Sequence, residues 1–470
     1  MSESQTRFSV LREAADGDVV AAIEALVREG NDRDLNRVNV LDFADRRGLN
    51  VDRALAAFLH ASRLGLFDMS WNLLCPGCGG VLNANATLKT VQRESYNCTL
   101  CAAGYEPTLD EMVEVSFTVN PRVRRIAAHD PHTLPQWEYN RQMYWSSGVR
   151  LPEGDAFDAF LKEMLLEGVE LPAGEKCIIQ LQLPAQFCIV FEPVTHAAHF
   201  IDVQGEPTGE RQELSVLFNR QSTPTATVQM RPGPLRLTLD NRTDTRVLPA
   251  VIVANDALHH MLGDRKPFLT ARQVVTNQTF RDIYRTAAMD VDQRFKITSL
   301  TFLFTDLKGS TEMYERVGDL VAYDLVRAHF GVVNEIVAME SGAVVKTIGD
   351  AVMATFPTPD RGVNAALRMR EAMRGLNDKR GHEDFTLKIG LHEGPCLAVT
   401  LNDRLDYFGQ TVNIAARVQG LAMARSIFAT KPVVDNPGAA RVLAESGITP
   451  LPQRHSLRGI AEAMQVYEIP

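Results

Sequence analysis

The spacing of hydrophobic and polar positions changes along the chain and divides it into segments. Over residues 8–66 apolar side chains recur every three or four positions, as in amphipathic helices, and residues 66–71 then read as a strand. Helix, short turn, helix and strand in this order resemble a winged helix. We therefore expect residues 1–70 to form a helical, winged-helix-like domain. Such a domain either binds DNA or docks a protein, and without a basic recognition helix docking is favoured.

Residues 113–266 follow a different pattern, in which short runs of strand-forming residues alternate with turns that contain Pro and Gly. Examples of these runs are 176–183, 187–191, 214–218 and 235–241. This pattern predicts a β-sandwich regulatory domain over 113–266. Its histidines are scattered, which argues against a catalytic centre there.

Residues 267–296 predict a connector, with one helix over 271–284. From residue 297 the predicted order is strand, helix, hairpin, helix, hairpin, helix. The strands fall at 299–304, 343–347, 351–356, 386–391 and 395–399, and two helices fall at 320–339 and 361–376. This order predicts a ferredoxin-like core, an antiparallel sheet with helices on one face. The whole chain is thus expected to be an α+β multidomain protein.

Composition narrows the class of protein. A chain of 470 residues is too long for one ordinary core, so several domains are expected. With 45% hydrophobic and 23% charged residues it belongs to the globular class. The net charge of −9 argues against a protein that coats nucleic acid. The polar N-terminus does not resemble a signal peptide, and the longest apolar runs fall far short of the ~20 residues that span a bilayer. A cytoplasmic protein without a membrane segment is expected.

Four cysteines form two Cys-x-x-Cys pairs, Cys75 with Cys78 and Cys98 with Cys101. Two such pairs on tight turns let four thiolates converge on one tetrahedral Zn²⁺. The alternative is a set of reduced or redox-active cysteines. The spacing favours a structural zinc ribbon over 71–112, and four protein ligands would leave no open position for catalysis.

Two carboxylates and a glycine turn stand where strands of the predicted sheet end. Asp306 ends the first strand of the core, and Asp350 lies on the turn of the neighbouring hairpin. Adjacent strands would bring the two within a few ångströms, where they suit a pair of Mg²⁺ or Mn²⁺ ions. The turn after Asp306 opens a helix, so the backbone N–H groups of Gly309, Ser310 and Thr311 can receive phosphates.

Further polar residues complete the set. Lys346 precedes Asp350 by four positions, Asp406 follows later, and Asn413 and Arg417 are four apart on one predicted helix face. The strings LFTDLKGST, KTIGD and DYFGQTVNIAAR that carry these residues resemble the class III adenylate/guanylate cyclase family. The resemblance covers about the last 170 residues.

The resemblance implies a nucleotidyl cyclase domain over 297–470 and a role for each polar residue. Asp306 and Asp350 would hold two Mg²⁺ or Mn²⁺ ions per active site. Of the others, Lys346 and Asp406 would recognise adenine, Asn413 would orient the ribose, Arg417 would neutralise charge on the α-phosphorus, and Arg458 would be a phosphate-binding cation.

The activity implied is that of an adenylate cyclase, which converts ATP to 3′,5′-cyclic AMP and pyrophosphate. In the family one site takes residues from two subunits, so a head-to-tail homodimer with two equivalent sites is expected. The upstream domains would regulate it through a partner protein or a small-molecule effector. Two alternatives remain. One is a cyclase with another base preference, guanylate or pyrimidine. The other is a non-catalytic, DNA-binding nucleotide sensor, against which the acidic balance and the complete residue set argue.

Overall fold

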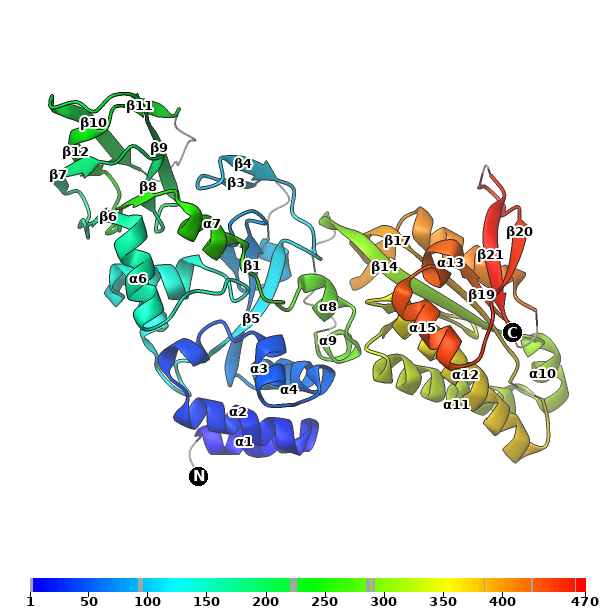
Figure 1. Ribbon diagram of the computed structural model, residues 1–470. Coiled ribbons are helices and arrows are strands. Elements are labelled where there is room, and N and C mark those ends of the chain that lie inside the picture. The colour runs from blue at the N-terminus through cyan, green and yellow to red at the C-terminus, as the bar shows by residue number, and fades with distance from the viewer. Residues whose placement is uncertain are drawn as a thin grey trace. The chain divides into compact units, whose positions relative to one another are not determined.

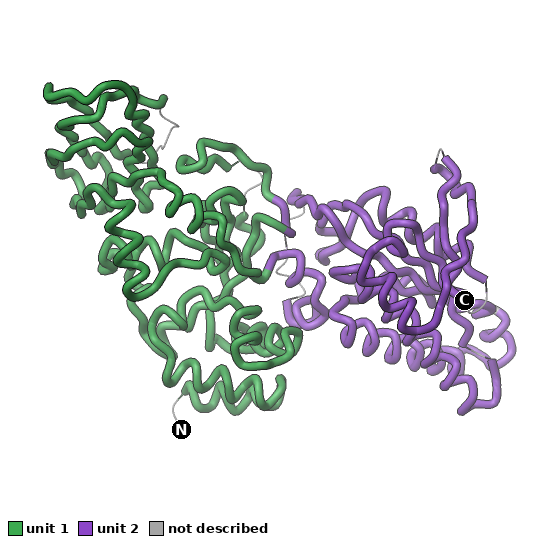
Figure 2. The backbone as a smooth tube through the Cα atoms, viewed as in Figure 1, with its two compact units in different colours: residues 1–107, 111–269 green, residues 108–110, 270–470 purple. Residues whose placement is uncertain are grey.

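The computed structural model describes residues 3–91, 96–219, 226–284, 289, 292–383, 385–423, 426–460 and 462–470. It separates into two compact units (Figure 2). Unit 1 comprises residues 1–107 and 111–269, and unit 2 comprises residues 108–110 and 270–470. Among the described residues, no helix is both long and apolar enough to cross a bilayer.

Unit 1 begins with four helices, as the helical spacing predicted (Figure 1). Asp16, Asn39 and Asn50 start three of them by accepting hydrogen bonds from backbone N–H groups of the first turn. The apolar faces meet in a core that continues into the next sheet through an aromatic cluster. The helices are α1 (Glu3–Ala14), α2 (Gly17–Glu29), α3 (Val40–Arg46) and α4 (Val51–Arg63).

That sheet has β1 (Phe67–Leu74) in the centre, with β2 (Val81–Asn85) and β5 (Val113–Val119) antiparallel on either side. Ring centroids of Phe58 lie 5.3 Å from Phe67 on β1 and 5.2 Å from Phe117 on β5. The pattern grouped residues 113–119 with the β-sandwich, and this grouping is wrong. Their side chains complete the core under the N-terminal helices instead.

Between β2 and β5 the chain carries the cysteine pairs and a two-stranded sheet of β3 (Tyr96–Cys98) and β4 (Ala103–Tyr105). After β5 come short helical turns and helices. They are η3 (Ala127–His129), η4 (Pro131–Thr133), α5 (Gln136–Tyr139), η5 (Asn140–Tyr144) and α6 (Asp155–Met164). Two short helical turns lie before β5: η1 (Asp32–Leu35) between α2 and α3, and η2 (Leu88–Thr90) between β2 and β3.

The strands from residue 165 to 253 form two sheets with one shared core. One sheet has the order β10-β12-β7 and the other β11-β9-β8-β13-β6. Val190, Ile201, Phe218, Leu237 and Val251, contributed by both sheets, are buried together between them. This is a sandwich. Its elements are β6 (Leu165–Gly168), β7 (Lys176–Leu183), β8 (Cys188–Glu192), β9 (Ala197–Val203), β10 (Gln212–Phe218), β11 (Val228–Met230), β12 (Gly233–Asn241) and β13 (Ala250–Val253), followed by α7 (Asp256–Gly263).

Unit 2 opens with α8 (Ala271–Val275) and α9 (Gln278–Ile283). The prediction of one helix over 271–284 is therefore wrong. Asn277 causes the break, because its side chain accepts a hydrogen bond from the N–H of Phe280 and starts a second helix.

The main sheet of unit 2 has the order β15-β16-β14-β17-β19-β21-β20, and β18 pairs with β17. Its elements are β14 (Arg294–Leu307), α10 (Ser310–Val317), α11 (Asp319–Met339), β15 (Ala343–Ile348), β16 (Ala351–Phe356), α12 (Pro359–Arg380), β17 (Leu387–Leu401), β18 (Arg404–Phe408), α13 (Gln410–Leu421), β19 (Ile427–Thr430), α14 (Lys431–Val434), α15 (Pro437–Glu445), β20 (Leu451–His455) and β21 (Met464–Ile469).

The second predicted hairpin is placed differently in the structure. Residues 386–391 and 395–399 were expected to be its two strands, but they belong to the single strand β17, and β18 is the returning strand. Gly394 lies inside β17. It is needed in the strand because a Cβ there would come 2.9 Å from Oγ1 of Thr411 on α13.

Helices cover both faces of this sheet. On β19 Ile427 and Ala429 belong to the core beneath α11, α12 and α15, whereas Phe428 belongs to the core beneath α13. Successive residues of a strand point to opposite faces, so α13 lies on the face opposite α11 and α12. The expectation of helices on one face holds for α11 and α12 and fails for α13.

Candidate functional site

Asp306 and Asp350 lie at the same end of two neighbouring strands, as predicted. In the β14–β16 ladder Thr305 is opposite Val352, so Asp306 lies next to the β15–β16 turn that carries Asp350. Burial raises the pKa of Asp306 above its usual range, the charge of Asp350 raises it further, and Lys388 opposes this. The two carboxylates therefore interact.

These carboxylates suit divalent cations. Oδ2 of Asp350 is buried and has no hydrogen-bond partner in the described part of the chain. Like charges held together raise the cost of ionising both groups, and a bound cation relieves that cost. Carboxylate oxygens are the donors that Mg²⁺ and Mn²⁺ prefer.

The carboxylate of Asp306 points to the α13 side of the sheet. Leu303 and Leu307 on the same strand belong to the core beneath α11 and α12. By alternation Asp306 must face the other way, toward the face that α13 covers. The helix that carries Asn413 and Arg417 thus lies over the same face as the first carboxylate.

Lys346 and Asp406 lie together although sixty positions separate them. Nζ of Lys346 donates to Oδ2 of Asp406 at 2.5 Å, and Oδ1 accepts from the N–H of Tyr407 at 2.8 Å. Asp406 is buried, with 9% of its side chain exposed, whereas the Lys346 side chain is 41% exposed. The pair presents a hydrogen-bond donor beside an acceptor at the surface of the domain.

Asn413 and Arg417 both lie on α13, with Asn413 exposed and Arg417 half-buried. The Arg417 guanidinium rests against the backbone of Gly459, where a Cβ would come 3.3 Å from its Nη1. Gly459 has a left-handed φ of 74° and follows the exposed Arg458 directly. The turn that carries Arg458 therefore adjoins Arg417.

The predicted phosphate turn has the expected backbone. Gly309 lies before α10 with a left-handed φ of 72°, and Ser310 begins the helix. The side chain of Thr311 lies outside the described part of the chain. Its N-terminal position on α10 is the one predicted.

The four cysteines of the two Cys-x-x-Cys pairs converge. Their Sγ atoms all lie within 4.8 Å of one another, with Cys75 to Cys101 at 3.6 Å and Cys78 to Cys98 at 3.7 Å. Tetrahedral Zn²⁺ with Zn–S bonds of about 2.3 Å separates its sulfurs by about 3.8 Å. The N–H groups of Cys78 and Gly80 donate to thiol sulfurs at 3.5 and 3.4 Å. The cluster fits one structural Zn²⁺ ion.

His329 was not singled out from the sequence. It is a fully buried residue of α11 within electrostatic reach of Asp350. Burial lowers its pKa to about 4. It reads as an ordinary core position of an amphipathic helix, so no sequence signal distinguishes it.

Comparison with known proteins defines the class of unit 2. Residues 293–444 match the model of the adenylate and guanylate cyclase catalytic domain. The chain therefore carries a class III cyclase catalytic domain, and the resemblance of its motifs is confirmed. Residues 1–282 match the model of a family of unknown function, DUF5939, and the chain belongs to that family.

Individual relatives match through the C-terminal part. An adenylate cyclase of Anabaena cylindrica is 27% identical over 185 residues, which are 36% of this chain and 36% of that protein. The human guanylate cyclase soluble subunit beta-2 is 26% identical over 159 residues, 32% of this chain and 25% of that protein. The chain thus spans about a third or less of the length of these two relatives.

Among solved structures, the adenylyl cyclase CyaB from P. aeruginosa is 20% identical. The structural match spans 38% of this chain and 96% of the CyaB chain, with a TM-score of 0.33.

Proposed function

We propose that this protein is an adenylate cyclase that converts ATP to 3′,5′-cyclic AMP and pyrophosphate. One observation carries the proposal. In a cyclase catalytic domain, the carboxylates Asp306 and Asp350 interact and the base-recognition candidates Lys346 and Asp406 are paired at 2.5 Å. A degenerate domain would have no reason to keep both arrangements.

The Lys346–Asp406 pair supports adenine as the base. The edge of adenine offers a ring-nitrogen acceptor beside an amino donor, which matches a lysine donor beside an aspartate acceptor. Guanine offers a carbonyl acceptor where adenine has the amino group, and that oxygen would face the Asp406 carboxylate. Relatives of both kinds match this domain, so base preference is part of the proposal.

The reaction joins the ribose 3′-oxygen to the α-phosphorus, breaks the bond from that phosphorus to pyrophosphate and releases the hydroxyl proton. Divalent cations held by Asp306 and Asp350 would supply the lowered pKa of the 3′-hydroxyl and neutralise phosphate charge. Asn413 orients the ribose. Arg417 stabilises the charge that develops on the α-phosphate oxygens, a contribution that is typically about 3 kcal/mol of barrier. Gly309, Ser310, Thr311 and Arg458 bind the outgoing phosphates.

A homodimer would assemble the complete site. Two large apolar side chains beside site residues are exposed in a single chain: Ile348 is 54% exposed and Phe408 65%. Ile348 precedes the Gly349–Asp350 turn and Phe408 follows Asp406 by two positions. Exposed apolar groups of this size are typical of surfaces that another chain covers. A second copy, with its own two half-sites, satisfies this and gives two equivalent sites.

The cysteine cluster would hold one structural Zn²⁺ in the regulatory unit. Its surroundings support this role, because Cys75, Cys78 and Cys98 are buried and pack with Tyr144 and Phe191 in one core. Four thiolates around Zn²⁺ carry a net negative charge. Arg265 lies beside them and donates to the carbonyl of Gly77 at 3.1 Å.

The proposal is tested with the purified full-length chain, Mn²⁺ and each of ATP, GTP, CTP and UTP, measuring cyclic nucleotide and pyrophosphate. We expect cyclic AMP from ATP and a loss of at least a hundredfold in Asp350→Ala. Asp378→Ala, at an exposed position of α12, is the matched control and should keep full activity. If a verified dimer makes no cyclic nucleotide from any triphosphate, the proposal is wrong.

A further inference from the structure

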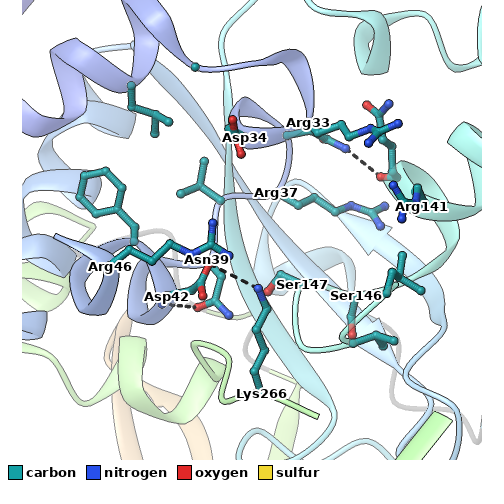
Figure 3. A pocket seen from close by; sticks show the side chains of 18 of the residues that line it. Arg33, Asp34, Arg37, Asn39, Asp42, Arg46, Arg141, Ser146, Ser147 and Lys266 are labelled. Atoms are coloured by element: carbon teal, nitrogen blue, oxygen red, sulfur yellow. Dashed lines mark hydrogen bonds and ion pairs between the residues drawn. The ribbon is translucent and has the colours of Figure 1, made fainter. Parts of the chain in front are cut away.

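Unit 1 contains a cavity of about 1030 Å³ that the cyclase chemistry does not use. It lies between the C-terminal end of α2, the η1–α3 segment and residues 141–153, with Lys266 on one wall. Figure 3 shows labelled side chains of the η1–α3 segment and of residues 141–147 around it, together with Lys266. Its volume is at the upper end of the range for small-molecule sites.

The lining is basic although the chain is acidic. Seven lysines and arginines face four carboxylates in the lining, whereas the whole chain has a net charge of −9. A local excess of positive charge in a hollow concentrates the field on small anions. The cavity is therefore the opposite of the carboxylate site in unit 2.

Three of the guanidinium groups have no carboxylate at ion-pair distance among the described residues: Arg37, Arg47 and Arg141. Arg37 donates one hydrogen bond to the carbonyl of Met143 at 2.7 Å. Arg141 stacks on Phe157 at 4.4 Å, and its Nε is buried without a partner in the described part of the chain. Guanidinium groups held in this way keep N–H donors available for an oxyanion.

The backbone at Arg37 supports a functional reading. Its φ is +48°, a left-handed value that is unfavourable for a side chain as large as arginine. Its N–H donates to Oγ1 of Thr118 at 3.0 Å, which helps to hold this conformation. Such strain is retained where it positions a functional group. Burial also lowers the pKa of Arg37 and Arg141, as expected for cations that lack a counter-charge.

Two further cations of the lining, Arg46 and Lys266, share a single carboxylate. The carboxylate of Asp42 lies 3.0 Å from Arg46 and 3.3 Å from Lys266, so one anion serves two cations. In Figure 3 these groups meet beside Asn39. An incoming anion would compete with Asp42 for both of them.

We propose that this cavity binds a polyanionic small molecule, up to about the size of a nucleotide, through its phosphate or carboxylate oxygens. Arg37 and Arg141 bind one anionic group, and Arg46 and Lys266 bind another. Ser146 and Asn39, both buried and in the lining, add neutral hydrogen-bonding groups.

The site is an effector site for the cyclase, a role that rests on the proposed function. Lys266 donates its N–H to the carbonyl of Gly148 at 2.9 Å, and Asn39 donates to the carbonyl of Pro267 at 2.8 Å. Leu269 follows Lys266 by three positions, and the long segment of unit 2, residues 270–470, begins at the next residue. A ligand that draws Lys266 away from Asp42 acts on the segment that leads directly into the cyclase unit.

The test separates binding from regulation. Calorimetric titration of the full-length chain with pyrophosphate and, separately, with citrate is done without added divalent cation, so that the cyclase site does not take up the probe. We expect one site per chain for at least one probe, with pyrophosphate marking a phosphate ligand and citrate a carboxylate ligand. Arg141→Gln should weaken binding about tenfold or more. Arg141 is partly buried, so its substitution can also lower the stability of the fold. Arg46→Gln is therefore a second variant, because 62% of the arginine side chain is exposed.

Arg122→Gln is the matched control, because Arg122 is exposed in the same unit and lies outside the cavity lining. Failure of both probes to bind, or binding that is unchanged in the Arg141 and Arg46 variants, overturns the site. Binding that leaves the rate of cyclic AMP formation unchanged overturns the effector role. Absence of any cyclase activity refutes the proposed function and leaves the binding result intact.

Discussion

The two units each gather like charges, and they do so with opposite signs. Unit 2 brings the carboxylates of Asp306 and Asp350 together at one edge of its sheet, and unit 1 lines a cavity with guanidinium groups. Neither arrangement stabilises the isolated chain, because like charges repel and partial burial removes water. Both become favourable when a ligand of the opposite charge binds. We therefore expect the unbalanced charge of each site to select its ligand, divalent cations in unit 2 and an anion in unit 1.

The supports of the two sites differ as well. Both carboxylates of unit 2 lie at the ends of strands in a sheet with helices on both faces. The cavity of unit 1 is walled by loops and short helices, and its Trp145 and Val149 belong to the core that also contains the cysteine cluster. We therefore expect the anion site to depend on zinc and the carboxylate site to depend on it much less.

The largest effect is expected when zinc is removed. Structural Zn²⁺ typically contributes more than 10 kcal/mol of folding free energy, so Cys78→Ser should unfold the region around it. We expect metal analysis to show one zinc per wild-type chain and none in the variant, with anion binding lost. The buried Cys188 lies outside the cluster, and Cys188→Ser should keep its zinc. An unchanged zinc content in Cys78→Ser would show that the cluster is not the metal site.

Arg417→Ala tests whether a defect in the cyclase site leaves the anion site of unit 1 unaffected. We expect cyclic AMP formation to fall several hundredfold, because about 3 kcal/mol of transition-state stabilisation is lost. Anion binding in unit 1 should be unchanged in the same preparation. Arg441→Ala, at an exposed position of α15, is the control. An equal loss of anion binding in Arg417→Ala would contradict the separation.

Exchanging the base-recognition pair should alter selectivity in unit 2 alone. In Lys346→Glu combined with Asp406→Ser, the acceptor and donor are rearranged to suit guanine. We expect the ratio of kcat/KM for ATP to that for GTP to fall about tenfold to a hundredfold. Lys379→Gln, at an exposed position of α12, changes the net charge by the same amount as the double variant and should keep the ATP preference. Retention of the ATP preference in the double variant would remove these two residues from base recognition.

The smallest effect concerns pH, and it compares one histidine from each unit. Burial lowers the pKa of His196 in unit 1 and of His392 in unit 2 to about 4. The folded-state pKa lies below the unfolded value of about 6.5, so each neutral ring contributes stability above pH 6.5 that is lost as the pH falls toward 4. Urea unfolding at pH 7 and pH 5 should show that His196→Gln and His392→Gln lose less stability on acidification than wild type, on the order of 1 kcal/mol each. The exposed His382→Gln should behave like wild type.

What the sequence could predict depends on how local the determining residues are. The cysteine pairs and the strings around Asp306, Asp350 and Asn413 carry their chemistry within a few positions. Within one chain, the structure brings together the four cysteines, Asp306 with Asp350, and Lys346 with Asp406. Pairing between distant strands was harder to predict, which is why β5 was assigned to the wrong sheet. The strand β17 was divided into two predicted strands, because the pattern does not show that Gly394 is needed for the approach of α13. The cavity carries no motif, since its arginines lie on two segments, 33–47 and 141–150, that are far apart in the sequence.

The central claim is that a carboxylate half and a base and ribose half, taken from two copies of this chain, make one cyclase site. The most direct test mixes two inactive variants, Asp306→Ala/Asp350→Ala and Asn413→Ala/Arg417→Ala, under conditions in which subunits exchange. Half of the dimers would then be mixed, and each mixed dimer would contain one intact site of two. The account predicts that cyclic AMP formation recovers to about a quarter of the wild-type rate. No recovery in a mixture that demonstrably exchanges subunits would contradict it.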